Sequence, residues 1–153
     1  MSDQRQRGFT LLEMVCVLAI VALLSSVALP FVPRQTSRPR LQAYALQAVT
    51  LLKSDRAASM RSGARIDTRI DISRRLIRAG SGAALQLPDD VAFQATLPRS
   101  CQHRPVQAAI SFFPDGLSCG GALTLSRADL SLEIRVNWLT GRIDIVPRGP
   151  AHG

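Results

Sequence analysis

Residues 8–32 read GFTLLEMVCVLAIVALLSSVALPFV, a long and mainly apolar segment. Between Phe9 and Val32 the only charged side chain is Glu13. At a rise of about 1.5 Å per residue, a helix of this length spans roughly 36 Å, more than the ~30 Å hydrocarbon layer of a bilayer. A chain of 153 residues is too small to surround such a helix with core on every face. We therefore predict a membrane-spanning helix over residues 9–32.

A removable secretory signal is the alternative that these residues leave open. Arg5 and Arg7 form a short positive segment before the apolar run, and residues 26–28 (SVA) resemble a small-residue cleavage site. Glu13 argues against this alternative, because an ionised carboxylate costs about 2.5–3.5 kcal/mol at the centre of a membrane helix and less toward its end. A helix that keeps Glu13 needs something to compensate that cost.

The rest of the chain has the composition of one soluble domain, too short for a large multidomain enzyme. The chain holds 19 basic and 11 acidic residues, a net charge of +8, and the excess lies in positions 33–153. Lys53 is the only lysine, so nearly all of the positive charge is arginine.

The segment from Gly8 to Glu13 resembles the N-terminus of type IV pilins and the related pseudopilins. The resemblance implies that a prepilin peptidase removes residues 1–8 as a leader, cleaving after Gly8 and N-methylating Phe9. It also implies a single span of the bacterial inner membrane, with the N-terminus cytoplasmic and the C-terminal domain periplasmic. Pro30 matches a proline of the family's helix, where it removes one backbone hydrogen bond and introduces a kink.

The resemblance also answers the energetic question that Glu13 raises. Cleavage creates a positively charged amine at Phe9, and methylation preserves the charge. Paired with the amine of a neighbouring subunit, Glu13 is neutralised within a bundle of helices during filament assembly. Because desolvation offsets much of the attraction, we expect the pair to set the register between subunits more than to add stability.

A second resemblance lies toward the C-terminus. Residues 112–116 (FFPDG), 120–121 (GG) and 137–142 (NWLTGR) are similar to the H-subunit family of minor pseudopilins of type II secretion systems. This implies a structural subunit of the periplasmic pseudopilus, which helps to export folded proteins across the outer membrane. The partners implied are other pseudopilins in a hetero-oligomeric filament, the prepilin peptidase, the inner membrane and secreted substrates.

The alternative function is a minor pilin of a type IV pilus that binds DNA during uptake. The charge of +8 motivates it, because arginine contacts to phosphates supply non-specific affinity. The arginines are spread through the domain, however, with little aromatic interleaving. Nucleic acid is therefore the less favoured partner.

Residues 33–61 are predicted to form a linker and an amphipathic helix from about Leu41 to Met60. Apolar residues recur there at helical spacing, and Gly63 is a plausible end. The apolar stripe consists of Leu41, Tyr44, Ala45, Ala48 and Leu52. We expect it to pack on a sheet, a groove for a partner being the alternative.

Residues 62–147 are predicted to form a β-rich periplasmic domain, followed by a flexible tail over 148–153. Apolar and polar residues alternate over 66–72 and 91–97, and further strand-like runs cover 106–113, 123–125, 130–138 and 142–146. Pro114 to Gly116 predicts a turn, and Trp138, at the end of its run, is expected to fill the core. The predicted class is α+β: a long N-terminal helix, membrane-spanning in its first half and amphipathic in its second, packed on antiparallel sheet.

Cys101 and Cys119 are predicted to form a disulfide, with two free thiols as the alternative. In an oxidising periplasm such a bridge would stabilise a small domain by about 3 kcal/mol. Cys16, within the apolar run, is expected to be a packing residue.

The sequence predicts no enzyme, no cofactor and no metal site. It contains no nucleophile elbow and no phosphate-binding glycine loop, and its two histidines stand apart from other ligand residues. Asp89 and Asp90 are expected to lie in a solvated turn rather than to bind a cation.

Overall fold

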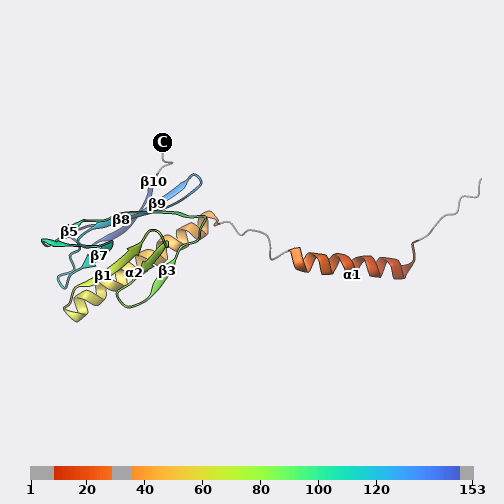
Figure 1. The fold of residues 1–153 in the computed structure, drawn as a ribbon, viewed down its shortest axis with the longest axis horizontal. Coiled ribbons are helices and arrows are strands. Elements are labelled where there is room, and N and C mark those ends of the chain that lie inside the picture. Colours follow the sequence, from red (N-terminus) through yellow and green to blue (C-terminus); the bar gives the residue numbers. More distant parts are fainter. Residues whose placement is uncertain (1–8, 29–35, 149–153) are drawn as a thin grey trace, which may run out of the picture. The chain divides into compact units, whose positions relative to one another are not determined.

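The computed structural model describes residues 9–28 and 36–148, and the chain divides into two units between Gln35 and Thr36 (Figure 1). The predicted leader (residues 1–8), Pro30 and residues 149–153 lie outside the described residues.

The first unit contains helix α1, Leu11–Ala28. Thr10 begins it: the Thr10 hydroxyl oxygen accepts a hydrogen bond from the backbone N–H of Glu13 at 3.3 Å, and its carbonyl accepts from Met14 at 3.3 Å. The side chains from Phe9 to Ser25 are all exposed. Within residues 9–28 and 36–148, no helix combines the length and the apolar character needed to cross a membrane.

The second unit begins with helix α2, Arg38–Ser62. Pro39 lies in its first turn, where a missing N–H costs nothing. Gly63 ends the helix with a left-handed φ of +66°, and its N–H donates to the Ser59 carbonyl oxygen at 3.0 Å. The predicted helix and its glycine end are confirmed, the helix being longer by three residues at the start and two at the end.

Within the described residues 66–148, ten strands follow, arranged as two four-stranded antiparallel sheets and a short hairpin. The first sheet has the order β3-β2-β1-β7, the second β10-β9-β8-β4, and β5 pairs with β6. The bounds are β1 Ile66–Asp71, β2 Leu76–Arg78, β3 Ala84–Gln86, β4 Ala92–Thr96, β5 Ser100–Cys101, β6 Arg104–Pro105, β7 Ala109–Phe112, β8 Gly121–Arg127, β9 Leu130–Val136 and β10 Ile143–Arg148.

Helix α2 contacts strands of both four-stranded sheets (Figure 1). Its buried face holds the predicted stripe, with Tyr44 half-buried at its margin, and the apolar residues of the strands point toward it as their period of two requires. The fully buried side chains include Leu41, Leu52, Ile77, Ile110, Phe112, Leu123, Leu125 and Ile134. The predicted α+β class is confirmed.

The prediction that Trp138 fills the core is wrong, because its side chain is 66% exposed. Strand β9 ends at Val136, and the Asn137 side chain then starts a turn by accepting hydrogen bonds from the N–H groups of Leu139 and Thr140. Such an Asx turn ends the alternation of buried and exposed residues along β9, so Trp138 lies outside that pattern.

Candidate assembly site

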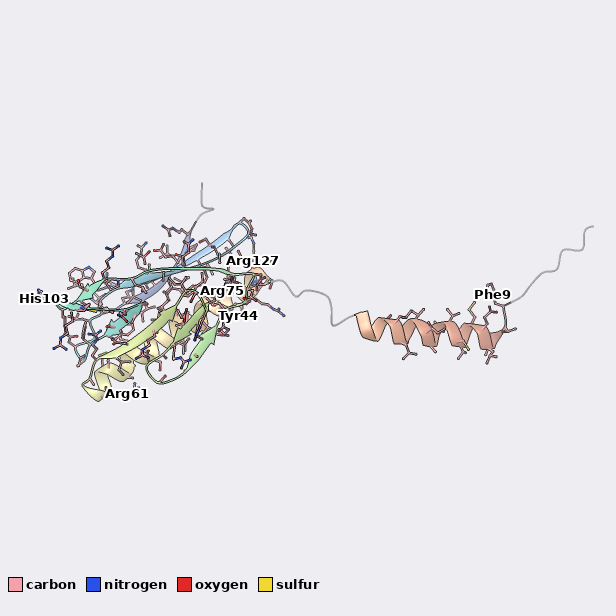
Figure 2. All side chains as sticks on the ribbon, viewed as in Figure 1. Phe9, Tyr44, Arg61, Arg75, His103 and Arg127 are labelled. Carbon is pink, nitrogen blue, oxygen red and sulfur yellow. A yellow bond between two sulfur atoms is a disulfide. The ribbon has the colours of Figure 1, made fainter. Side chains whose placement is uncertain are left out.

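Phe9 and Glu13 lie at the same end of α1. Phe9 is 76% exposed and precedes the helix, and the Glu13 carboxylate lies exposed in the first turn (Figure 2). A carboxylate in this position interacts favourably with the helix dipole and remains available to a cation from outside the unit. The predicted cleavage residue Gly8 and the predicted kink at Pro30 are outside the described residues.

From Leu11 to Ser25 the exposed side chains of α1 are apolar except for Glu13 and Ser25. Side chains such as Leu11, Val15, Leu18 and Leu24 are each more than half exposed. A helix with this surface is stable only where lipid or other helices cover it. The exposed Cys16 belongs to this surface and has no disulfide partner.

In the second unit, Arg56 of α2 holds the turns that follow β7 and β9. Its Nε donates to the carbonyl oxygen of Gly116 at 3.0 Å, and its Nη2 donates to that of Thr140 at 3.2 Å. One turn further along α2, the Ser59 hydroxyl donates to the Phe113 carbonyl oxygen at 3.1 Å. The segments at 112–116 and 137–142 therefore meet at the C-terminal half of α2.

Glycine residues allow these two turns to pack closely against each other. Gly116 and Gly141 have φ values of +80° and +61°, in the left-handed region that favours glycine. A Cβ on Gly141 would collide with the Gly116 carbonyl oxygen and would lie 2.7 Å from Arg56 Nε. We conclude that these sequence segments serve the fold, by allowing two turns to pack together.

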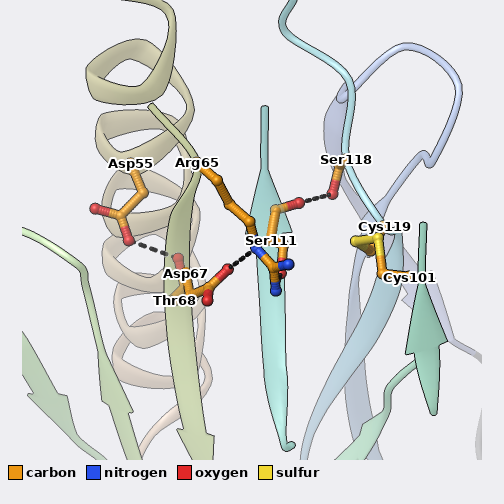
Figure 3. Close-up of polar contacts among 8 residues, drawn as sticks. All are labelled: Asp55, Arg65, Asp67, Thr68, Cys101, Ser111, Ser118 and Cys119. Carbon is orange, nitrogen blue, oxygen red and sulfur yellow. Dashed lines mark hydrogen bonds and ion pairs between the residues drawn. A yellow bond between two sulfur atoms is a disulfide. The ribbon is translucent and has the colours of Figure 1, made fainter. Parts of the chain in front are cut away.

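Asp55 of α2 is a buried carboxylate that no motif of the sequence indicates. It is fully buried, and its Oδ2 accepts a hydrogen bond from the Thr68 hydroxyl at 2.6 Å (Figure 3). The Gly80 N–H donates to the same oxygen at 2.8 Å. Its Oδ1 has no hydrogen-bond partner among the residues that the structure describes. Because Asp55 continues the buried spacing of Leu52, the helical period was the signal that would have found it.

A second set of polar contacts links β1 and the residue before it to β7. Arg65 donates to the Asp67 carboxylate and to the Ser111 hydroxyl, each at 2.8 Å (Figure 3). Partial burial raises the pKa of Asp67, but hydrogen bonds from Arg65 and Ser111 and the positive charge of Arg65 outweigh it, so the pKa is lowered. The Arg65 guanidinium also lies 5.9 Å from the centre of the Phe113 ring.

Cys101 and Cys119 form a disulfide in the structure, with their Cα atoms 5.7 Å apart (Figure 3). The bridge joins the β5–β6 hairpin to the segment that leads into β8.

Asp89 and Asp90 lie in an exposed turn, and the Asp90 carboxylate also contacts two other residues of the protein. This carboxylate accepts from the backbone N–H of Thr36 at 2.7 Å and from the Thr36 hydroxyl at 2.8 Å, and Arg127 Nε lies 2.9 Å from it. The hydrogen bond from the Thr36 N–H, then that from its hydroxyl and the charge of Arg127, lower the pKa of Asp90. The neighbouring Asp89 is paired with Arg75 at 2.6 Å. In residues 9–28 and 36–148 no three Asp, Glu, His or Cys residues gather as a metal site would require.

An apolar helix with a glutamate in its first turn, followed by a domain in which a helix packs on antiparallel sheet, defines the class of pilin-like proteins. A family model described as the prokaryotic N-terminal methylation motif matches residues 3–29. The chain is 32% identical over 146 residues to type II secretion system protein H of Xanthomonas campestris pv. campestris, which covers 95% of this chain and 86% of that protein. The chain therefore belongs to the type II secretion system protein H family.

The fold agrees with this membership. The structure of the minor pseudopilin EpsH from the type 2 secretion system of Vibrio cholerae superposes with a TM-score of 0.50, covering 74% of this chain and 98% of that one at 13% sequence identity. At this identity the match shows the fold. Together the comparisons confirm the family interpretation that residues 8–13 and 112–142 suggested.

Proposed function

We propose that this chain is a minor pseudopilin, a structural subunit of the periplasmic pseudopilus through which type II secretion exports folded proteins across the outer membrane. The observation that carries the proposal is the end of α1, where Phe9 and the Glu13 carboxylate precede side chains that are exposed as far as Ser25 and are apolar up to Leu24. Such a helix suits packing against equivalent helices in a filament.

The proposal includes processing and anchoring. A prepilin peptidase cleaves after Gly8 and methylates Phe9, and residues 9–32 anchor the subunit in the inner membrane with a cytoplasmic N-terminus. The second unit then lies in the periplasm, where an oxidising environment permits the Cys101–Cys119 disulfide.

Glu13 has the central role in assembly. In the membrane its charge is unfavourable unless a cation compensates it, and the new amine of Phe9 on a neighbouring subunit supplies one. The pair fixes the axial register of adjacent helices. The globular unit works through contacts with other pseudopilins and secreted substrates, and we assign it no enzymatic step.

The test compares Glu13→Val and Glu13→Gln with the control Ser25→Ala, a change at another exposed polar position of α1. Mass spectrometry of the native protein is expected to find methylated Phe9 as the first residue in all three. Cross-linking to other pseudopilins and secretion should fall for both Glu13 variants and stay normal for the control. Normal incorporation without the carboxylate, or a native chain that begins at Leu29, would contradict the proposal.

The second candidate is a minor pilin that binds DNA, and the charge of +8 favours it. Pairing of arginines with carboxylates weighs against it, because it neutralises part of that charge; Arg38 with Asp129 and Arg75 with Asp89 are examples. A gene deletion that abolishes DNA uptake while secretion persists would favour this second candidate.

A further inference from the structure

Two arginines stand directly opposite each other on the outer face of the first sheet. Arg69 of β1 pairs in register with Arg78 of β2, and both side chains are exposed. Their neighbours Thr68, Ile70 and Ile77 are buried on the other face. Since side chains alternate along strands, both guanidinium groups leave the sheet on the same side.

This arrangement is unfavourable without a counter-ion. Like charges directly opposite in an antiparallel pair destabilise the sheet. Nearby arginines have carboxylate partners, as Arg65 has Asp67 and Arg74 has Asp71. Among the described residues neither Arg69 nor Arg78 forms an ion pair within 4.0 Å. The charge of Arg69 still acts on Asp67, whose pKa it helps to lower.

The same two arginines border two hollows of the surface. One has a volume of about 640 Å³ and is lined also by Ile72 and Leu76, and the other has a volume of about 400 Å³. Ile72 is 46% exposed and Leu76 is half-buried, so aliphatic carbon lies beside the cations. We call this surface the Arg69–Arg78 groove.

We propose that the Arg69–Arg78 groove binds an acidic segment of a partner protein, with a carboxylate between the two guanidinium groups and an apolar neighbour against Ile72 and Leu76. A guanidinium donates paired hydrogen bonds that match the geometry of a carboxylate. The bound carboxylate removes the repulsion between the arginines. The proposal does not depend on which system the subunit serves, because it concerns the chemistry of this face.

The neighbouring charges favour a carboxylate over nucleic acid. Asp67 and Asp71 alternate with Arg69 along β1, on the same face of the sheet. Asp67 and Asp71 would repel the continuous row of phosphates of a nucleic acid. A single side-chain carboxylate, in contrast, fits between these two aspartates and reaches the arginines. The residues that line the two hollows also include no aromatic ring on which a base would stack.

The experiment measures binding of a fluorescent capped peptide, Gly-Leu-Glu-Glu-Leu-Gly, to the full chain in detergent micelles at low salt. The matched peptide carries glutamine for both glutamates, and a short DNA duplex is the third probe. Arg69→Gln and Arg78→Gln should each weaken binding of the acidic peptide about tenfold, as expected for lost charge-assisted hydrogen bonds. The control variants Arg40→Gln and Arg61→Gln, which remove exposed arginines of α2, should leave it unchanged.

A second measurement separates a binding role from a structural one. Without peptide, Arg78→Gln should raise the melting temperature at low salt, because it removes the like-charge repulsion and leaves the attraction between Arg69 and Asp67 in place, and added salt should shrink the difference. A lower melting temperature would show that the arginines support the fold. Equal binding of the two peptides, equal losses in the control variants, or duplex binding that depends on Arg69 and Arg78 and exceeds peptide binding would each overturn the proposal.

Discussion

Arg56 on α2 and Gly116 in the turn after β7 lie 60 residues apart in sequence, and the Arg56 guanidinium Nε donates to the Gly116 carbonyl oxygen at 3.0 Å. The same guanidinium donates to the Thr140 carbonyl oxygen. One side chain thus satisfies backbone acceptors in two turns and fastens both to the helix. The side chain is only partly buried, so it achieves this without the cost of isolating a charge from water.

Gly141→Ala should destabilise the second unit by about 2–4 kcal/mol. About 1 kcal/mol comes from the left-handed backbone and about 1–3 kcal/mol from crowding against Gly116 and Arg56. Gly63→Ala is the matched control, since Gly63 has a φ of +66° but nothing within 4 Å of a new Cβ. Urea unfolding of the full chain in micelles measures both, and equal losses would show that the contact between the turns carries no cost.

The regular part of this fold was predictable because its signals are local. The 3.6-residue period from Leu41 onward and the glycine at position 63 define α2, and alternation defines β1, β4 and β9. Strands β2 and β3 have three residues each, too few for a period to emerge, and their positions follow from pairing with β1. Trp138 was misplaced because the Asn137 side chain, which ends the strand, acts through hydrogen bonds that periodicity does not record.

Asp55→Ala should cost about 2–4 kcal/mol. The change leaves the buried Thr68 hydroxyl without its acceptor, at about 1–3 kcal/mol, and the partly buried Gly80 N–H without its acceptor, at about 1 kcal/mol. Asp55→Asn should cost less, because one amide oxygen still accepts from both donors. Chemical unfolding of the three proteins measures the order.

A double-mutant cycle with Thr68→Val provides the control. The loss in the double variant should be smaller than the sum of the two single losses, since each single change breaks the same hydrogen bond. Strict additivity would mean that Asp55 and Thr68 do not stabilise each other.

The contribution of Asp90 to stability should depend on pH. Its pKa is below the ordinary 3.8 in the folded protein, so the folded state favours the ionised form. The stabilisation is therefore fully present above pH values near 3.8 and is lost as the pH falls through the lower, folded pKa. Thermal unfolding should show Asp90→Asn to be less stable than the native chain at neutral pH, with the gap closing in acid. A difference in stability that stays constant with pH, or one that Asp89→Asn reproduces, would argue that the hydrogen bonds between Thr36 and Asp90 do not stabilise the fold.

Removal of the Cys101–Cys119 disulfide should lower the free energy of unfolding of the second unit by about 3 kcal/mol, since the bridge closes a loop with a sequence separation of 18. The double variant Cys101→Ser/Cys119→Ser and the reduced native chain should agree in denaturant titrations. Cys16→Ser, at the free cysteine of α1, should leave this transition unchanged. If reductant has no effect on the native chain, the two cysteines are not paired in solution.

The candidate site was only partly accessible to reasoning from sequence. Glu13 stands out because a charge interrupts an apolar run, and charge patterns are visible in the sequence. Phe9 follows only from the resemblance of residues 8–13 to the N-terminus of type IV pilins. The opposition of Arg69 and Arg78 is invisible there, since it depends on the register between β1 and β2. The role of Arg56 was hidden for the same reason: its acceptors are backbone atoms far along the chain.

The hydrogen bonds at Thr36 affect how a pull on the chain would enter the second unit. Thr36 is the first residue of the second unit, and it is held at its N–H and hydroxyl by Asp90 and at its carbonyl oxygen by Arg127 of β8. Any pull that travels along the chain from the N-terminal side enters the domain at this residue. Part of such a load therefore passes to Asp90 and Arg127 before it reaches α2, which begins two residues further along at Arg38.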